Sequence, residues 1–300
     1  MKNYIFIIEF LLVCCLIILV FMIDKNTDYS LFSNKELEIW EDSVFDESKE
    51  NLILVHSFPT NTVLLEGLGE YLKDYFNLYF IDLPGFNPEI SPLKEISFDY
   101  YRKYTSDKIN GLNLENYWIG GISFGFLIVN EIGGTDNCLG IFALEPFLGI
   151  KDTKVSPINV FFLKMVSDLV NLTNTQEWLW RSDIFKYFLS KGNTADRIDL
   201  MLKTVDPKTF FKTGDLILNH EEEIKFQNKP YILMINKNDK TILTSDVVET
   251  FKSKIKDLLI VETEVEHYPK TISVEYFEKT IGKDDIESVY NFIDKIKKNY

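Results

Sequence analysis

The feature that most constrains the fold is a regular alternation of short apolar runs with longer segments of helical spacing. Runs typical of buried strands occur at residues 52–55, 78–81, 117–119 and 140–144. The segments between these runs carry apolar side chains at helical spacing, over residues 62–75, 98–112 and 124–132. Strands that alternate with helices predict an α/β fold, a mostly parallel sheet flanked by helices. The reactive groups of such sheets lie at the carboxyl ends of the strands.

The alternation stops after the fourth strand pattern. Residues 151–228 hold helical patterns rich in aromatic side chains, including Trp178, Trp180, Phe210 and Phe211. Strand patterns then return at residues 231–235 and 258–261, and a final helix covers about 273–298, with a break at Gly282. We therefore expect one α/β core in two parts, 51–150 and 229–300, interrupted by a helical lid over 151–228.

Charge and cysteine content exclude several classes of function. The 300 residues carry a formal net charge of −14, and so acidic a surface repels phosphate backbones, which predicts no nucleic-acid partner. The 3 Cys and 3 His form no cluster with metal-ligand spacing, so we predict no metal and no other cofactor. The sequence leaves the oligomeric state open.

The first residues read as a membrane segment. Residues 4–23 are apolar apart from Glu9, and a helix of this length spans a hydrocarbon core of about 30 Å. A cleaved signal peptide is the main alternative, but the run ends without the small residues of a cleavage site. A buried helix is a third reading. The sequence thus predicts a single-pass N-terminal transmembrane anchor, followed by a polar linker over residues 24–50.

One motif points to chemistry. Gly121-Ile122-Ser123-Phe124-Gly125 follows a predicted strand and opens a predicted helix, the context that a G-x-S-x-G nucleophile turn requires. A sharp strand-to-helix turn exposes the Ser123 hydroxyl, and side chains at the two glycine positions would collide with the backbone around them. The motif therefore predicts Ser123 as a nucleophile, with the helix N-terminus favouring the negative charge that develops.

With this motif in place, the chain resembles the α/β-hydrolase superfamily over about residues 51–299. Residues 55–60 (Val-His-Ser-Phe-Pro-Thr) and 81–86 (Ile-Asp-Leu-Pro-Gly-Phe) are similar to the turns after two of that family's strands. In the family the order along the chain is nucleophile, acid, base. Here that order is Ser123, Asp239, His267.

The resemblance implies a role for each of these residues. His267 would take the serine proton and pass it to the leaving group, while Asp239 would hold the imidazole and stabilise its cation. Glu145, at the end of a strand pattern, is the alternative acid. The oxyanion hole would consist of the backbone N–H groups of Phe58 and Phe124.

The chain departs from the family pattern at two places. Ser57 stands where the family usually has Gly, which puts the oxyanion hole and full activity in doubt. The segment before residue 52 is too short for two further full strands, so we expect a sheet that is short on one edge. Among the remaining polar residues, we expect His56 to hold its own loop, Asp82 to cap the turn that follows it, and His220 to be exposed.

These observations predict a serine hydrolase that cleaves an ester, or another acyl bond, through an acyl-enzyme. The aromatic lid suggests a pocket for a small apolar substrate, with esters of medium chain length reacting faster than acetate. Dehalogenases and epoxide hydrolases resemble this chain but use an Asp nucleophile, which disfavours both readings. A catalytically silent binding or scaffold protein remains an alternative, as does a transacylase.

Overall fold

A computed structural model describes residues 45–190, 194–267, 269 and 273–299. The predicted anchor over residues 4–23 and most of the predicted linker lie outside these described residues. Within the described ranges, no helix is both long enough and apolar enough to cross a membrane.

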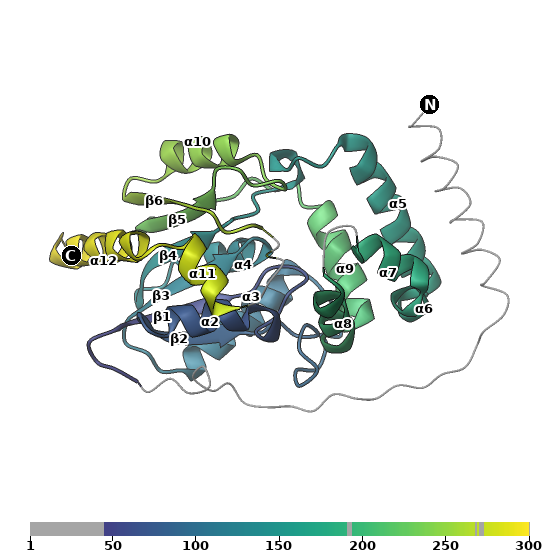
Figure 1. The fold of residues 1–300 in the computed structure, drawn as a ribbon, viewed down its shortest axis with the longest axis horizontal. Helices are drawn as coiled ribbons and strands as arrows, with labels where there is room; N and C mark the ends of the chain where they lie inside the picture. Colours follow the sequence, from purple (N-terminus) through teal and green to yellow (C-terminus); the bar gives the residue numbers. More distant parts are fainter. Residues whose placement is uncertain (1–44, 191–193, 268, 270–272, 300) are drawn as a thin grey trace. The chain divides into compact units, whose positions relative to one another are not determined.

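The centre of the fold is a parallel sheet of six strands in the order β2-β1-β3-β4-β5-β6 (Figure 1). Every neighbouring pair in this sheet is parallel. The strands are β1 (Glu50–Val55), β2 (Phe76–Ile81), β3 (Tyr117–Ile122), β4 (Cys138–Leu144), β5 (Tyr231–Asn236) and β6 (Leu258–Thr263). Each of the six strand patterns seen in the sequence is a strand of this sheet, so that prediction is confirmed.

Helices cover both faces of the sheet because its strands are apolar on both sides. On one face pack α3 (Phe98–Gly111), α4 (Phe124–Ile132) and α10 (Thr244–Lys254), against a core that includes Ile53 and Val55 of β1. On the other face pack η1 (Val63–Leu65), α2 (Glu66–Leu72), α11 (Val274–Thr280) and α12 (Lys283–Asn299), with Leu52 and Leu54. Alternate residues of one strand thus enter opposite cores.

The helix predictions hold with local differences. The predicted final helix breaks at Gly282, as expected, since α11 ends at Thr280 and α12 begins at Lys283. The helix expected over 62–75 is shorter and starts with the 3-10 turn η1. Helix α10 was missed, because only Val247 and Phe251 are buried and two apolar positions leave a weak periodic signal.

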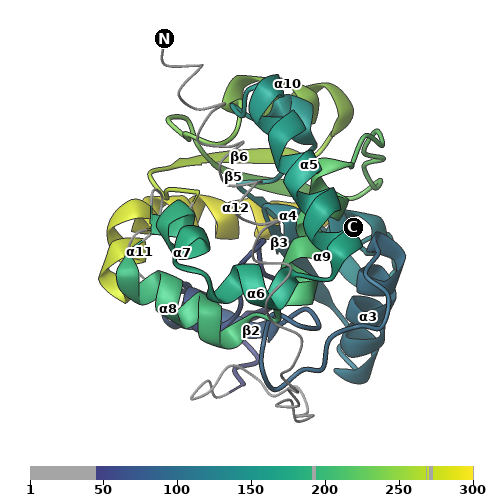
Figure 2. The same ribbon diagram turned by 90° about the vertical axis from the view of Figure 1, so that its right-hand side faces the viewer.

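A helical insertion separates β4 from β5. It begins with η2 (Ile150–Asp152) and continues through α5 (Pro157–Thr173), α6 (Gln176–Arg181), α7 (Asp183–Ser190), α8 (Ala195–Thr204) and α9 (Pro207–Leu218). Figure 2 looks onto these helices. In the described residues no strand pairs with the free edge of β2, in line with the short edge expected from the sequence.

Candidate functional site

The predicted nucleophile lies on a strained turn between β3 and α4. Ser123 has φ 49° and ψ −112°, a conformation that a residue with a side chain rarely adopts. The turn is held because the Ser123 N–H donates to the carbonyl of Leu144 at 2.9 Å, which continues the pairing of β3 with β4. Strain of this kind costs about 1–3 kcal/mol and persists only where the surrounding structure imposes it.

The two glycines of the motif make this turn possible. A Cβ atom on Gly121 would lie 2.5 Å from the backbone N and Cα of Phe126, inside the first turn of α4. A Cβ atom on Gly125 would lie 2.5 Å from the carbonyl oxygen of His56 and 2.6 Å from that of Val55, at the end of β1. The steric reason proposed from the sequence is therefore confirmed, with the colliding atoms identified.

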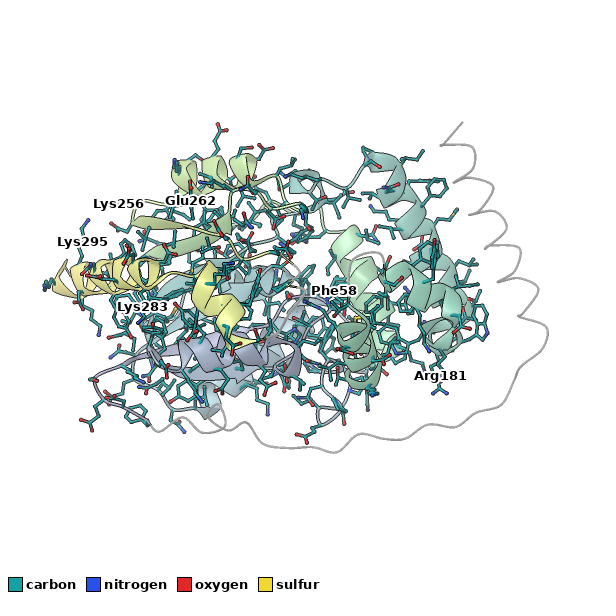
Figure 3. The ribbon with its side chains drawn as sticks, viewed as in Figure 1. Phe58, Arg181, Lys256, Glu262, Lys283 and Lys295 are labelled. Atoms are coloured by element: carbon teal, nitrogen blue, oxygen red, sulfur yellow. The ribbon has the colours of Figure 1, made fainter. Side chains whose placement is uncertain are left out.

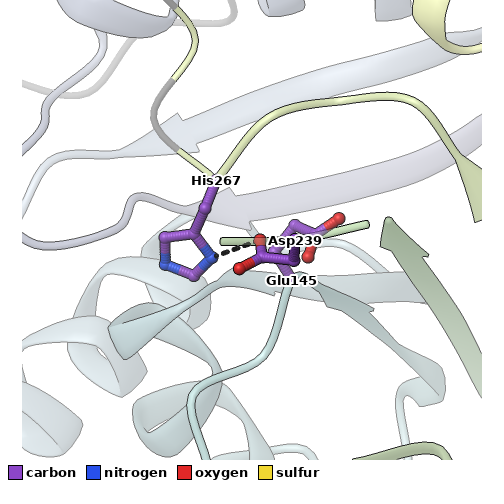
Figure 4. Close-up of side chains that lie close together, drawn as sticks. All are labelled: Glu145, Asp239 and His267. Atoms are coloured by element: carbon purple, nitrogen blue, oxygen red, sulfur yellow. Dashed lines mark ion pairs between the residues drawn. The ribbon is translucent and has the colours of Figure 1, made fainter. Parts of the chain in front are cut away.

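The structure brings the three predicted triad residues together from three segments of the chain. The Oγ of Ser123 and the Nε2 of His267 are 2.9 Å apart. On the other side of the ring, Nδ1 lies 3.3 Å from Oδ2 of Asp239, an ion-pair distance not aligned as a hydrogen bond (Figure 4).

The loop that carries His267 is held by two polar contacts. The side-chain amide of Asn236, the last residue of β5, donates to the carbonyl of Val265 at 2.9 Å. The Glu266 N–H donates to the hydroxyl of Tyr276 on α11 at 2.7 Å. The backbone just before His267 is therefore held by the last residue of β5 and by α11, and the His267 side chain is only 4% exposed.

Asp239 is buried and held in its ionised form. Its Oδ1 accepts from the N–H groups of Thr241 at 2.5 Å and Ile242 at 2.7 Å, while Oδ2 faces His267. Burial by itself would raise the pKa of Asp239. The contact with His267 and the two N–H groups outweigh burial, so the pKa lies below its usual value. A carboxylate in this state is suited to stabilise an imidazolium.

Glu145, the alternative acid, lies beside Asp239 (Figure 4) but is in a different state. It follows β4 with φ 44°, so two neighbouring strands both end in a strained residue. Its Oε1 accepts from the Asn236 N–H at 2.5 Å. Burial, and then the nearby charge of Asp239, raise the pKa of Glu145 to about 9. Glu145 is therefore a neutral carboxylic acid at pH 7.

Glu145, Asp239 and His267 are also the group of described residues whose side-chain atoms are close enough to hold a metal ion, within 4.8 Å of one another. Both ring nitrogens of His267 are already directed at Ser123 and Asp239. The Asp239 carboxylate on one side of the imidazole and the Ser123 hydroxyl on the other form an arrangement suited to moving a proton.

The loop after β1 lies next to the nucleophile turn. Phe124 is the first residue of α4, so the helix makes no use of its N–H group. Phe58 follows Ser57, the departure from the family pattern, whose hydroxyl pairs with that of Thr60 at 2.8 Å. Thr60 also donates to the Ser57 carbonyl at 2.9 Å. The extra side chain at position 57 is thus accommodated by a hydroxyl pair within its own turn.

Three further polar residues were singled out in the sequence. His56 is fully buried, and its Nε2 accepts from the Leu83 N–H at 2.8 Å, so it does tie its loop to the next one. Asp82 accepts from the Thr62 N–H at 2.7 Å and from the Asn87 side chain at 2.6 Å, so it binds a distant segment as well as its own turn. His220 was expected to be exposed. That prediction is wrong, because the ring is buried against Phe98 with centroids 4.9 Å apart.

A cavity of about 50 Å³ adjoins His267 and Glu145. Its wall is mostly apolar and comes from the core, including Leu65, Leu68, Ile122, Met234, Phe277 and Ile281. Ser57 and Thr60 line it as well, and from the insertion it receives the buried Arg197, which donates to the Pro269 carbonyl. None of the four insertion aromatics predicted to form a pocket lies in the wall of this cavity.

Three of those four aromatics, Trp180, Phe210 and Phe211, instead pack on one another and on Phe185. Trp180, Phe185, Phe210 and Phe211 form a cluster with ring centroids 4.9–6.4 Å apart. The cluster meets the core at Phe58, whose ring centroid is 5.0 Å from that of Phe210; Figure 3 shows Phe58 where the core adjoins the insertion. Their main contribution is therefore to join the insertion to the loop next to Ser123.

No protein-family model and no curated protein sequence matches this chain. Solved structures do match its fold. A putative ancestral haloalkane dehalogenase has a TM-score of 0.64 at 11% identity, over 85% of this chain and 99% of that chain. An esterase from a marine microorganism has a TM-score of 0.58 at 18% identity, over 86% and 99%. A bacterial membrane phospholipase A has a TM-score of 0.58 at 13% identity, over 84% and 81%.

The chain therefore has the α/β-hydrolase fold. At these identities the similarity establishes the fold alone, and the fold serves several chemistries, so the reaction has to be argued from the site.

Proposed function

We propose that the protein is a serine hydrolase that cleaves an ester, or another acyl bond, of a small apolar substrate through an acyl-enzyme. The observation that carries this proposal is the 2.9 Å contact between Ser123 Oγ and His267 Nε2, with the Asp239 carboxylate on the other side of the ring. A strained nucleophile, a base and an ionised acid in this order have the geometry of nucleophilic acyl transfer.

The reaction follows from the placement of these groups. With its proton on Nδ1, facing Asp239, His267 accepts the hydroxyl proton of Ser123 at Nε2 as Oγ attacks the carbonyl carbon. The oxyanion would be bound by the N–H groups of Phe124 and Phe58. His267 then protonates the leaving group, which departs and leaves an acyl-serine. A water molecule activated by the same imidazole releases the acid and restores Ser123.

The cavity beside His267 supports an apolar substrate. Its wall is mostly Leu, Ile, Met and Phe side chains, with Arg197 and Glu266 beside them, and it includes His267 but not Ser123, so the inference to an uncharged acyl or alcohol group rests on the apolar wall next to the base. The net charge of −14 disfavours anionic substrates for a separate reason, since it repels them before they reach the site. Among the structural neighbours, the esterase and the phospholipase A bear names that agree with ester cleavage.

A serine at position 123 separates this proposal from halide or epoxide chemistry. The dehalogenase neighbour shares the fold, but the resemblance associates that chemistry with an Asp nucleophile. A transacylase would use the same groups and differ only in the acceptor of the acyl group.

We extend the proposal to location. Residues 4–23 would anchor the chain in a membrane, and residues 151–228 would act as the lid of the site. The anchor is tested by alkaline carbonate extraction of the full chain together with mass spectrometry of its N-terminus. Release into the carbonate supernatant, or a mature N-terminus beyond Ile23, would replace the anchor with a cleaved signal.

The direct test of the chemistry is labelling with a fluorophosphonate, which reports an activated serine without knowledge of the substrate. Wild-type protein should be labelled, and Ser123→Ala should abolish the label while circular dichroism remains unchanged. The Ser57→Ala variant is the matched control, because its hydroxyl lines the cavity but is bonded to Thr60. Absence of label on a folded wild type would favour the silent scaffold.

A further inference from the structure

The exposed apolar side chains of the described residues are concentrated on two helices of the insertion. On α5 they are Ile158, Phe161, Leu163, Met165 and Leu172, and on α7 they are Tyr187 and Phe188. The two helices are joined by α6, which contacts both of them; in Figure 2 both face the viewer, with α5 to the right and α7 to the left. Exposed apolar side chains concentrated on neighbouring elements mark a place of contact with a partner or a membrane.

On α5 the exposed side chains form a stripe. Ile158, Phe161, Met165 and Leu172 stand 3, 7 and 14 positions apart from the first, which places them on one face of a helix. Phe161 is 63% exposed and Leu172 is 85% exposed. We call these four residues the α5 stripe.

The opposite face of α5 is already occupied. Ser167 and Val170 are buried, the Ser167 hydroxyl donates to the Phe211 carbonyl at 3.3 Å, and the helix packs along α9. Helix α5 is therefore apolar on two sides, only one of which the insertion covers. The α5 stripe therefore takes no part in packing α5 against α9.

We propose that the α5 stripe, with Tyr187 and Phe188, rests on the surface of a zwitterionic phospholipid bilayer, and that the substrate is an ester that partitions into that bilayer. The substrate class rests on the proposed function. Helices with an apolar stripe lie in the plane of the interface in this way, with the stripe buried about 5–10 Å deep.

Charge favours a bilayer over a second copy of the chain. The face that carries the α5 stripe is apolar except for Asp168, which is exposed between Met165 and Leu172, while Lys164 on the flank of α5 has its Nζ 3.9 Å from Oε1 of Glu221. Two copies would bring together two bodies of net charge −14, which repel each other. A zwitterionic surface imposes no such cost, whereas an anionic surface does.

The length of chain before the described residues allows this contact. The apolar run 4–23 is long enough to insert into the same bilayer, and residues 24–44 follow it. At up to about 3.3–3.6 Å per residue, such a segment reaches roughly 70 Å when extended. That reach exceeds the size of a domain of this length, so residues 24–44 would allow any face of the domain to meet the membrane. The α5 stripe would then determine which face binds.

A short path connects the stripe to the nucleophile. Helix α5 packs on α9. The ring of Phe210, on α9, packs on the ring of Phe58 in the loop next to Ser123, with the ring centroids 5.0 Å apart. The surface that would rest on lipid is thus one helix away from the proposed oxyanion loop.

The position of the stripe is tested with a fluorophore on the full chain in phosphatidylcholine vesicles. Cys14 and Cys15 are replaced by Ser, and Cys138 is fully buried, so Phe161→Cys provides the labelling site. The matched control is Tyr100→Cys on the core helix α3, where Tyr100 is exposed as well. We expect spin-labelled lipid to quench the label at position 161 several-fold more than the label at 100. Equal quenching at the two positions overturns the proposal. If the label at position 161 becomes protected from solvent as protein concentration rises, and spin-labelled lipid does not quench it, the proposal is overturned in favour of self-association.

A kinetic arm separates this inference from the proposed function. The double variant Phe161→Ser, Leu172→Ser should lose roughly tenfold in the hydrolysis of a vesicle-dissolved ester. It should keep wild-type rates on water-soluble p-nitrophenyl acetate and wild-type fluorophosphonate labelling, as should Tyr100→Ser on both esters. Equal loss on both esters overturns the membrane role. If wild type shows neither labelling nor acetate hydrolysis, the proposed function fails, while lipid quenching still reports on the stripe.

Discussion

The carboxyl edge of the sheet and the helical insertion are built in opposite ways. At the sheet edge Ser123, Glu145 and Asp239 are at most 6% exposed, two of them have left-handed backbone, and their polar atoms face specific partners. In the insertion, aromatic rings pack on one another while the α5 stripe faces outward. Acyl transfer requires atoms fixed to within fractions of an ångström, whereas apolar contact is non-directional. Specific polar contacts are thus concentrated where the chemistry would take place.

Within the sheet edge, the two neighbouring acids Asp239 and Glu145 also differ, in their protonation state. Asp239 and Glu145 follow adjacent strands and lie side by side, yet one is ionised and the other is neutral at pH 7. Two carboxylates this close repel each other, so one of them retains its proton. His267 lies against the ionised one.

The largest effect expected from this difference is on turnover. Asp239→Asn should lower turnover by about 10⁴, because the imidazole loses the charge that fixes its tautomer and stabilises its cation. Glu145→Gln, the matched change in the neighbouring acid, should cost much less, since the amide is neutral like the acid it replaces. Steady-state kinetics on one ester would decide. The reverse ranking would move the catalytic acid to position 145.

Glu145→Gln should instead change how stability depends on pH. Glu145 titrates near its ordinary value of 4.5 in the unfolded chain and at about 9 in the folded protein, so folding takes up a proton between these values. The wild type therefore loses stability as pH rises from about 4.5 to about 9, by on the order of several kcal/mol.

The measurement is urea unfolding of wild type and Glu145→Gln across this pH range, with Glu249→Gln on the exposed face of α10 as the control for loss of a charge. The Gln variant should show a flatter profile and exceed the wild type at pH 9. Parallel profiles would mean that Glu145 is ionised in the folded protein.

A smaller effect contrasts a glycine of the nucleophile turn with one of the insertion. Gly125→Ala places a Cβ 2.5 Å from the carbonyl oxygen of His56, just after β1, and should destabilise by about 1–3 kcal/mol, the usual cost of overpacking. Gly214→Ala on α9 meets only the Phe58 ring, at 3.6 Å, and should stabilise by up to about 1 kcal/mol. Thermal unfolding of both variants tests the contrast, and similar losses in the two would refute it.

The smallest effect concerns which region selects the substrate. Each methylene buried in the cavity beside His267 should gain about 0.8 kcal/mol, so p-nitrophenyl esters somewhat longer than acetate should react faster until the cavity is filled. Leu68→Phe places a larger side chain in the wall, reduces the volume of the cavity and should shift the chain-length preference toward acetate. Trp178→Phe in the insertion should leave the preference unchanged. A shift caused by Trp178→Phe alone would restore the insertion as the source of selectivity.

Much of the fold was predictable from local patterns. Each strand of the sheet is a short apolar run in the sequence. The break at Gly282 and the turn at Ser123 are both indicated by glycines, and a side chain in place of Gly121 or Gly125 would not fit. The apolar runs and the break at Gly282 involve neighbours in the chain, so their physical cause is contained within a few residues, whereas the turn at Ser123 is also held by Leu144 and by the end of β1. Helix α10 was not predicted, because only two of its residues are buried and two apolar positions give a weak periodic pattern.

What the tertiary structure alone decided are relations between segments far apart in the chain. The sequence placed both Glu145 and Asp239 at strand ends, but their opposite protonation states depend on a contact made only when β4 and β5 pair. The burial of His220 against Phe98, and a cavity walled by α2 and α11 instead of the insertion aromatics, have the same origin. Residue type and spacing determined which groups could react. Packing across the sheet determined which of them meet, because burial and charge are properties of the folded neighbourhood.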